Sequence, residues 1–325
     1  MTMRRFWVMS LTLCCLVGQL AGHGWAQGYP AKTVRYLVPM SAGSGADTIG
    51  RIAAGGLTQA FGQQVIVDNR TGAAANIGAE LAAKAPADGY TLFQVSMTHA
   101  ANASLYRNLP YDLLRDFAPV TLLALSPSGV SIHPSLPVKS ISELVRLAKA
   151  KPGMINYAST GVGSATFLSA ELFKGLAGID LQHVPYRGGG ESMGSVVTGE
   201  TSVYFVTLAP ALPLIRQGRL RLLAVSTARR LPMLPGYPTV TESGYPGFEA
   251  GNWFGLMVPA KTPRETIATI RGAAVAALNR PDISKRMHDL VYITIGNQPG
   301  EFAEHIKSEI EKWRKIIREK GITAN

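Results

Sequence analysis

Two segments rich in glycine and serine are the clearest candidates for chemistry in this sequence. Residues 38–47 read VPMSAGSGAD and residues 159–166 read STGVGSAT, and each lies between a short apolar run and a helical pattern. Glycine lets the backbone approach a ligand closely, and the first N–H groups of a helix carry partial positive charge. Each segment could therefore bind a carboxylate or a phosphate. Together the two segments could hold the two ends of one small anion.

Either segment alone also fits an ordinary tight turn. Asp47 could cap the helix that follows or could bind an amine on a ligand, and the sequence leaves both roles open. The first segment is neither a P-loop nor a dinucleotide fingerprint, because the G-K-[ST] ending and a third glycine are absent.

A third candidate region is residues 184–190, VPYRGGG, where an aromatic side chain and a cation follow another apolar run. Arg187 could form a bidentate contact with a carboxylate, or it could be an ordinary surface charge. Trp253 could line a ligand cavity or belong to the core. The full set of candidate ligand-binding residues is Ser41, Ala42, Gly43, Ser44, Asp47, Thr98, His99, Ser159, Thr160, Gly161, Gly163, Ser164, Tyr186, Arg187, Thr207 and Trp253.

One motif points to an enzyme instead. Residues 190–194, GESMG, match the pattern G-x-S-x-G with Ser192 as the nucleophile. A nucleophile elbow requires a strand that runs directly into the first glycine, followed later in the chain by an acid and a histidine. Asp282 or Asp289 with His305 would keep this order, but three residues separate the apolar run from the motif, and nothing places the acid and histidine near Ser192. A secreted serine hydrolase is therefore the alternative.

Metal and cofactor chemistry are not expected. The histidines are scattered singly, without metal-ligand spacing, at His23, His99, His133, His183, His288 and His305. We therefore expect no catalytic residue, no metal and no cofactor.

The composition indicates a folded protein with an anionic small-molecule partner. The 325 residues are 46% hydrophobic and only 16% charged, which is enough apolar material for two domains. Lys and Arg number 32 against 21 Asp and Glu, so the formal charge is +11. The densest basic stretch, Lys312–Lys320, has the mixed charges of an exposed helix face, and no nucleic-acid motif accompanies it. We therefore expect no nucleic-acid partner.

The N-terminus has the three parts of a secretory signal peptide. Arg4 and Arg5 precede the apolar run Phe6–Leu20, and small residues at Gly24 and Ala26 predict cleavage before residue 27. The run is shorter than the roughly 20 residues that a membrane span needs. Both cysteines, at positions 14 and 15, fall inside this segment, so the mature chain would lack thiol chemistry. We expect an exported, soluble, periplasmic protein.

Apolar runs alternate with helical patterns along the rest of the chain. This alternation predicts an α/β fold with parallel sheets covered by helices on both faces. Proline-rich stretches at 125–137 and 231–251 predict two crossovers between domains. We expect residues 1–26 to be the signal peptide, residues 27–126 plus 251–325 to form domain 1, and residues 127–250 to form an inserted domain 2. The strands are expected at Val34–Val38, Val65–Val67, Thr91–Val95, Val120–Leu125, Ile155–Ala158, Leu181–Val184, Val203–Val206, Leu220–Ser226 and Phe254–Val258.

The order and spacing of short segments resemble the Bug family, the extracytoplasmic solute receptors of tripartite tricarboxylate transport systems. The resemblance extends from the signal peptide to the last helix. The matching segments include VP with Gly43 and Asp47, residues 68–70 (DNR), 88–92 (DGYTL), 109–112 (LPYD), 117–120 (FAPV), 156–159 (NYAS), 183–188 (HVPYRG), 238–240 (PTV) and 253–256 (WFGL).

The resemblance implies a type II periplasmic-binding-protein fold, a Venus flytrap whose ligand lies in a cleft between two α/β domains. Family members bind dicarboxylates, amino acids or aromatic acids without catalysis. Backbone amides and water hold the ligand carboxylate at two loops, which here correspond to Ser41, Ala42, Gly43 and Asp47, and to Ser159, Gly161, Gly163 and Ser164.

The chain also departs from the family pattern. Phe167 replaces a frequent histidine, and Ser202 and Val206 replace frequent aspartates. These changes favour a less polar or aromatic acid as the ligand. The remaining departures are Met40, Ala42 and Ser44 for Phe, Pro and Gly, and Thr71, Ala74 and Ala75 for Pro and two Gly.

These observations predict a non-enzymatic, monomeric periplasmic receptor that captures a small carboxylate. The expected partners are that ligand and the membrane subunits of a tripartite tricarboxylate transporter. A receptor that presents its liganded form to a signalling protein is the other alternative, because both systems would use the same closed state.

Overall fold

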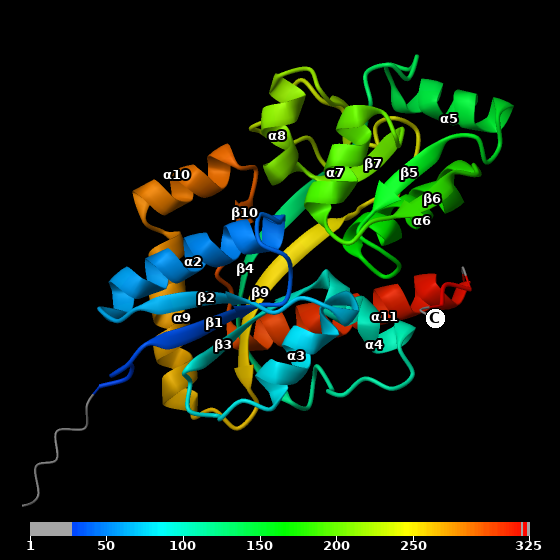
Figure 1. Ribbon diagram of the computed structural model, residues 1–325. Helices are drawn as coiled ribbons and strands as arrows, with labels where there is room; N and C mark the ends of the chain where they lie inside the picture. Colours follow the sequence, from blue (N-terminus) through cyan, green and yellow to red (C-terminus); the bar gives the residue numbers. More distant parts are fainter. Residues whose placement is uncertain (1–27, 320, 324–325) are drawn as a thin grey trace, which may run out of the picture. The chain divides into compact units, whose positions relative to one another are not determined.

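The computed structural model describes residues 28–319 and 321–323 (Figure 1). The described residues from 32 onward belong to one compact unit, and residues 28–31 belong to a separate unit. The expected signal peptide therefore lies outside the described residues. Within the described part of the chain, no helix combines the length and the apolar character needed to cross a bilayer.

The strands and helices alternate along most of the larger unit. The strands are β1 (Val34–Val38), β2 (Val65–Asn69), β3 (Thr91–Ser96), β4 (Phe117–Ile132), β5 (Asn156–Ser159), β6 (Gln182–Pro185), β7 (Val203–Thr207), β8 (Arg221–Val225), β9 (Gly251–Pro259) and β10 (Ile293–Thr294). The helices are α2 (Gly45–Phe61), the 3-10 helix η1 (Ala73–Ala75), α3 (Asn76–Ala83), α4 (Met97–Leu105), α5 (Ile141–Ala150), α6 (Ala165–Ala177), α7 (Gly189–Thr198), α8 (Leu208–Arg216), α9 (Arg264–Leu278), α10 (Pro281–Asp289) and α11 (Pro299–Glu319).

The strands pair in two sheets that share β4. In the first sheet β1 lies between β2 and β3 in parallel, and β9 pairs antiparallel with β3 and β4. In the second sheet β5 lies parallel between β6 and β7, and β4 pairs antiparallel with β7 and β8. The short β10 joins the first sheet beside β4. In Figure 1, β4 and β9 are the long strands that run between the two groups of strands.

The expected strands are present, with one added and several extended. The parallel arrangement is confirmed around β1 and β5 but is wrong for β4, β8, β9 and β10, because alternation along the chain reveals only the helical crossovers. β4 has 16 residues and continues through Pro119 and Pro127, so the irregular stretch expected from residue 125 begins only after Ile132. The register shifts next to Pro119, where the missing N–H interrupts the ladder. The domain limits at residues 126 and 250 stay a prediction.

Capping explains where several helices begin. Ser140 caps α5, since its Oγ accepts the Glu143 N–H at 3.2 Å. In α9 the N-cap is Pro263, and the Thr262 hydroxyl donates to the Pro259 carbonyl rather than capping the helix. The buried side of α11 is an apolar stripe that comprises Phe302, Ile306, Ile310, Trp313 and Ile317.

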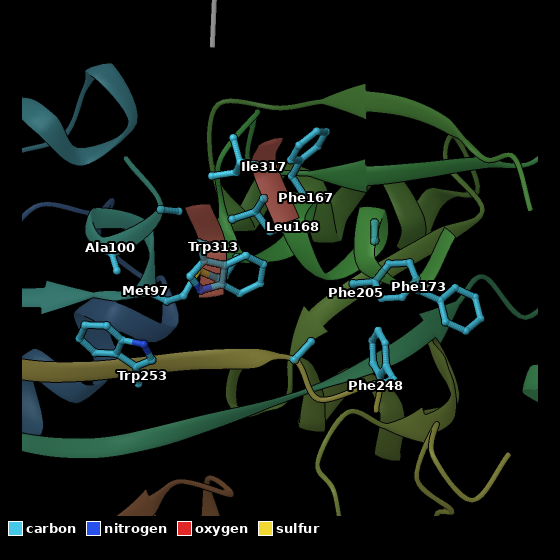
Figure 2. Close-up of a cluster of buried hydrophobic side chains, with 14 of the residues drawn as sticks. Met97, Ala100, Phe167, Leu168, Phe173, Phe205, Phe248, Trp253, Trp313 and Ile317 are labelled. Carbon is cyan, nitrogen blue, oxygen red and sulfur yellow. The ribbon is translucent and has the colours of Figure 1, made fainter. Parts of the chain in front are cut away.

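One hydrophobic cluster extends over both sheets. Figure 2 shows Met97, Trp253 and Trp313 in one part of it, and Phe205 and Phe248 in another. Such close-packed side chains resist displacement, so the strands of both sheets hold the loops at their ends in fixed positions.

Candidate functional site

A cavity of about 500 Å³ lies where the loops after β1 and β5 meet the starts of α7 and α8. Both glycine-rich segments of the sequence line it. The candidate residues in its wall are Ser41, Gly43, Ser44, Thr98, Thr160, Ser164, Arg187 and Thr207.

The loop between β1 and α2 ends in a serine-capped turn. Ser44, and not Asp47, is the N-cap: its Oγ accepts the Asp47 N–H at 3.2 Å, and its N–H donates to the Ser41 carbonyl at 3.2 Å. Gly43 has a φ of +76°, in the left-handed region that favours glycine. This turn places the first residues of α2 at the cavity wall.

Asp47 lies behind this loop and does not line the cavity. The carboxylate is buried; Oδ2 accepts hydrogen bonds from the Gly43 N–H and from Arg51 Nε, both at 2.9 Å, and Oδ1 accepts one from Asn69 Nδ2 at 3.0 Å. Burial alone would raise the pKa of Asp47, but the hydrogen bonds from Arg51, Gly43 and Asn69 outweigh burial and hold this pKa below its usual range. A charged carboxylate thus holds the first loop in place.

The loop between β5 and α6 repeats the same turn. Ser164 caps α6 by accepting the Phe167 N–H at 3.2 Å, and its own N–H donates to the Gly161 carbonyl at 3.2 Å. Gly163 has a φ of +82°, and a Cβ at this position would lie 2.4 Å from Leu105 Cδ1. Glycine is therefore required here both by the backbone conformation and by the close approach of α4.

Neutral side chains hold the second loop. Ser159 Oγ accepts the Gly161 N–H at 3.0 Å and lies 2.6 Å from His183 Nε2. Thr166 Oγ1 accepts the Thr160 N–H at 3.0 Å. Burial lowers the pKa of His183, which favours the neutral ring and lets Nε2 accept the Ser159 hydroxyl proton.

The first N–H groups of α2 and α6 are the donors that this arrangement offers to an anion. They belong to Gly45 and Ala46 and to Ala165 and Thr166, which all line the cavity. A helix supplies no internal acceptor for its first N–H groups, and its dipole makes that end partially positive. The cavity can therefore solvate one carboxylate from two sides.

The glycine amides expected to bind the ligand are used inside their own loops. The N–H of Gly43 donates to Asp47, and the N–H of Gly161 donates to Ser159. These bonds give each loop its shape and leave the helix starts as donors.

The start of α7 forms a third wall. Gly188 and the two glycines after it line the cavity, and a Cβ on Gly188 would lie 3.3 Å from Ser41 Oγ in the opposite loop. Arg187 is the one formally charged residue among the described residues of the wall. The backbone N–H of Arg187 donates to a Glu191 carboxylate oxygen at 3.1 Å. The rest of this side is largely apolar, with Met193 and Val206.

A fourth wall has an unusual backbone. Residues 71–75 line the cavity, and three successive alanines have left-handed φ angles: Ala73 at +47°, Ala74 at +51° and Ala75 at +73°. This conformation costs an L-residue about 1–2 kcal/mol. Surrounding contacts must therefore stabilise the turn.

Several candidates lie outside the cavity wall, namely Ala42, Asp47, His99, Ser159, Gly161, Gly163, Tyr186 and Trp253. His99 is fully buried and its Nδ1 accepts the Ser96 N–H at the start of α4, while burial lowers its pKa to about 4. Trp253 faces the core, and its indole N–H donates to Glu309 at 3.0 Å. The His99 and Trp253 side chains therefore stabilise α4 and β9 rather than line the cavity.

The sequence reasoning missed Asn252, which lines the cavity beside Trp253 in β9. Phe254, on the other side of Trp253, lines the cavity as well. Side chains alternate between the faces of a strand, so assigning Trp253 to the core would have pointed to its two neighbours.

Ser192 does not form a nucleophile elbow. It is fully buried inside α7, and its hydroxyl lies within donor distance of the Ser159 carbonyl at 3.1 Å and the Gly188 carbonyl at 3.0 Å. A strand-to-helix turn would instead expose the hydroxyl. Among residues 28–323, as far as they are described, no cluster of three or more His, Cys, Asp or Glu could hold a metal ion.

Comparison with known proteins gives a consistent picture. The sequence profile of the tripartite tricarboxylate transporter family receptor, TctC, matches residues 49–322. Protein BugT of Bordetella pertussis is 32% identical over 298 residues, which cover 91% of each chain. An R. palustris protein solved with adipate is 34% identical, with a TM-score of 0.87 and coverage of 91% of this chain and 99% of that one.

The periplasmic binding protein BugD is 28% identical, with a TM-score of 0.86 and coverage of 91% of this chain and all of BugD (100%). Its fold matches the two paired sheets described above. The chain therefore has the two-domain α/β fold of a periplasmic binding protein and belongs to the Bug family of tripartite tricarboxylate transporter receptors.

Proposed function

We propose that this protein is a periplasmic receptor that captures a small carboxylate and presents it to the membrane subunits of a tripartite tricarboxylate transporter. The observation that carries the proposal is the pair of serine-capped turns whose helix starts, at Ala46 and Ala165, line one cavity. An unpaired carboxylate is costly to bury, and these N–H groups supply the hydrogen bonds that it needs.

The charges of the wall favour the same ligand class. The described wall residues include Arg187 and no acidic side chain, so the side chains that line the cavity carry a positive charge. Attraction of this kind speeds the capture of an anion. The R. palustris relative was solved with adipate, which is a carboxylate.

The remaining wall favours a ligand with an apolar body. Met40, Val162, Met193, Val206 and Phe254 lie around the cavity. Dicarboxylates with a methylene chain and aromatic acids are therefore the preferred candidates within the carboxylates, ahead of highly hydroxylated acids.

A thermal-shift screen of the purified protein tests the proposal. The panel contains monocarboxylates, adipate, malate, citrate, amino acids and aromatic acids, and sugars and amines serve as negative controls. A carboxylate should raise the midpoint of unfolding in proportion to the logarithm of its excess over the dissociation constant, without being consumed. Stabilisation by sugars or amines alone, or turnover of the ligand, would contradict the proposal.

The transporter partnership and the monomeric state need separate measurements. Light scattering during size exclusion should give the mass of one chain with and without ligand. Reconstituted membrane subunits should take up the ligand only when the receptor is present. Capture of the liganded receptor by a signalling protein, with no uptake, would favour the signalling alternative.

A further inference from the structure

A buried side chain of α4 is bound to the left-handed turn Ala73–Ala75. Asn102, in α4, is fully buried, and its Nδ2 donates to the Ala74 carbonyl at 2.8 Å. The same Nδ2 lies 2.8 Å from Asn76 Oδ1. Asn102 therefore connects the core of the first sheet to the strained wall of the cavity.

A second donor completes this network. The Tyr111 hydroxyl donates to Asn76 Oδ1 at 2.7 Å, and both side chains are buried. Hydrogen bonds between buried polar groups are costly to break, because each separated group stays without water. The network can thus oppose the tendency of alanine to leave the left-handed region.

Asn102 also faces the second glycine-rich loop. Its Oδ1 is buried without a hydrogen-bond partner among the described residues, and it lies 3.5 Å from the place of a Cβ on Gly163. Asn102 therefore lies between the Ala73–Ala75 turn and the loop between β5 and α6. Asn102 itself does not line the cavity, whereas Ala74 does.

We propose that Asn102 is a positioning residue for the carboxylate site: its amide holds the Ala73–Ala75 turn in the left-handed conformation, and that conformation sets the shape of the cavity wall. The inference rests on the proposed function, because it assigns to Asn102 an effect on ligand affinity without ligand contact. Glycine adopts the left-handed region without penalty. A glycine at position 74 should therefore keep the turn in place even when the Asn102 amide is lost.

Four proteins test this inference: wild type, Asn102→Leu, Ala74→Gly and the double variant. Leucine has a similar size but no donor. Titration calorimetry with adipate as the probe should show affinity reduced about tenfold in Asn102→Leu, a 1.4 kcal/mol change, and largely restored in the double variant. Ala74→Gly alone should raise the melting temperature by about 2 °C, because the strain is relieved, and its own affinity is the reference for the double variant, since Ala74 lines the cavity.

Two further variants keep the test decisive. Tyr111→Phe removes only one donor of the network. It should reduce affinity less than Asn102→Leu does, and Ala74→Gly should restore the affinity here too. This variant keeps the test available even if Asn102→Leu does not fold. Ala54→Gly, in the middle of α2 and away from the cavity wall, should lower the melting temperature and rescue neither variant.

The outcomes separate the inference from the proposed function. Affinity unchanged in Asn102→Leu, or a loss that Ala74→Gly does not restore, overturns the positioning role while carboxylate binding stands. Wild-type protein that binds neither adipate nor any other carboxylate of the screen overturns both. Unfolding of the unliganded proteins gives an independent check, since purely additive stability changes at positions 74 and 102 also contradict the inference.

Discussion

The two glycine-rich loops have the same backbone design and different supports. In both, a left-handed glycine precedes a serine N-cap: Gly43 and Ser44 in the first loop, and Gly163 and Ser164 in the second. The serine N–H donates three residues back at 3.2 Å in each case. The same turn thus places a helix start against the same cavity twice.

The supports differ in charge. The ionised Asp47 holds the first loop by accepting hydrogen bonds from the Gly43 N–H and from the Asn69 side chain. Hydroxyls and a neutral imidazole, those of Ser159, Thr166 and His183, hold the second. The turn itself therefore specifies the donors, and its support can be ionic or neutral. The two supports should therefore respond differently to mutation and to pH.

Loss of the ionic support should have the largest effect. Asp47→Ala leaves the Gly43 N–H without an acceptor and removes one of the two acceptors of Asn69 Nδ2, which keeps the Met40 carbonyl. We expect a loss of about 3 kcal/mol in unfolding free energy, since bonds to charged groups contribute most. Ligand affinity should fall as well. Urea unfolding and calorimetry measure both. Arg51→Ala is the matched control: it removes only the half-exposed partner of the ion pair and should cost less than 1 kcal/mol.

The two equivalent glycines should differ in their tolerance of alanine. Gly43→Ala adds left-handed strain alone, because a Cβ there meets nothing within 4 Å, and should cost about 1 kcal/mol. Gly163→Ala adds the contact with Leu105 as well and should cost about 2 kcal/mol or more.

Urea unfolding checks this difference. A shorter side chain at position 105, combined with Gly163→Ala, should bring the cost of the alanine close to the Gly43→Ala value. Equal losses in the two single variants would show that α4 does not constrain the second loop.

The supports should fail in different pH ranges. Burial lowers the pKa of His183 below its ordinary value of 6.5, so as the pH falls the unfolded chain binds a proton before the folded chain does. The contribution of the neutral His183 to the free energy of unfolding is therefore complete above pH 6.5 and is lost as the pH falls toward the folded pKa. The pKa of Asp47 is also lowered in the fold, so its contribution is complete above the ordinary value of 3.8 and is lost only below it.

Stability curves of His183→Gln and Asp47→Asn test this order. Relative to wild type, His183→Gln should make the free energy of unfolding depend less on pH below about pH 6.5. Asp47→Asn should do the same below about pH 4. A single shared range for both variants would contradict the distinction between a neutral and an ionic support.

Removal of one hydroxyl should have the smallest effect. Thr166→Val keeps the shape of the side chain but leaves the Thr160 N–H without its 3.0 Å acceptor, and should cost about 1 kcal/mol. Thr48→Val, in α2, removes a hydroxyl that only donates to the Ser44 carbonyl and serves as the comparison. A loss with Thr48→Val as large as that with Thr166→Val would argue against a specific support at Thr160.

Local pattern was enough to predict the loops but not their chemistry. Glycine and serine between a strand and a helix predicted both turns, and the alternation of elements predicted the α/β class. The sequence could not reveal that Asp47 and Ser159 accept the hydrogen bonds of the Gly43 and Gly161 N–H groups, because those bonds depend on side-chain placement. The antiparallel course of β4 and β9 and the turn at Ala74 depend on long-range contacts, which periodicity does not report.

We expect one carboxylate to be bound by both helix starts at once. Backbone amide NMR of the protein titrated with adipate, or with the best carboxylate of the screen, tests this expectation. The Ala46 and Ala165 amide signals should both move downfield and should follow one saturation curve with one dissociation constant. Movement of only one of the two signals, or two different dissociation constants, would contradict the account.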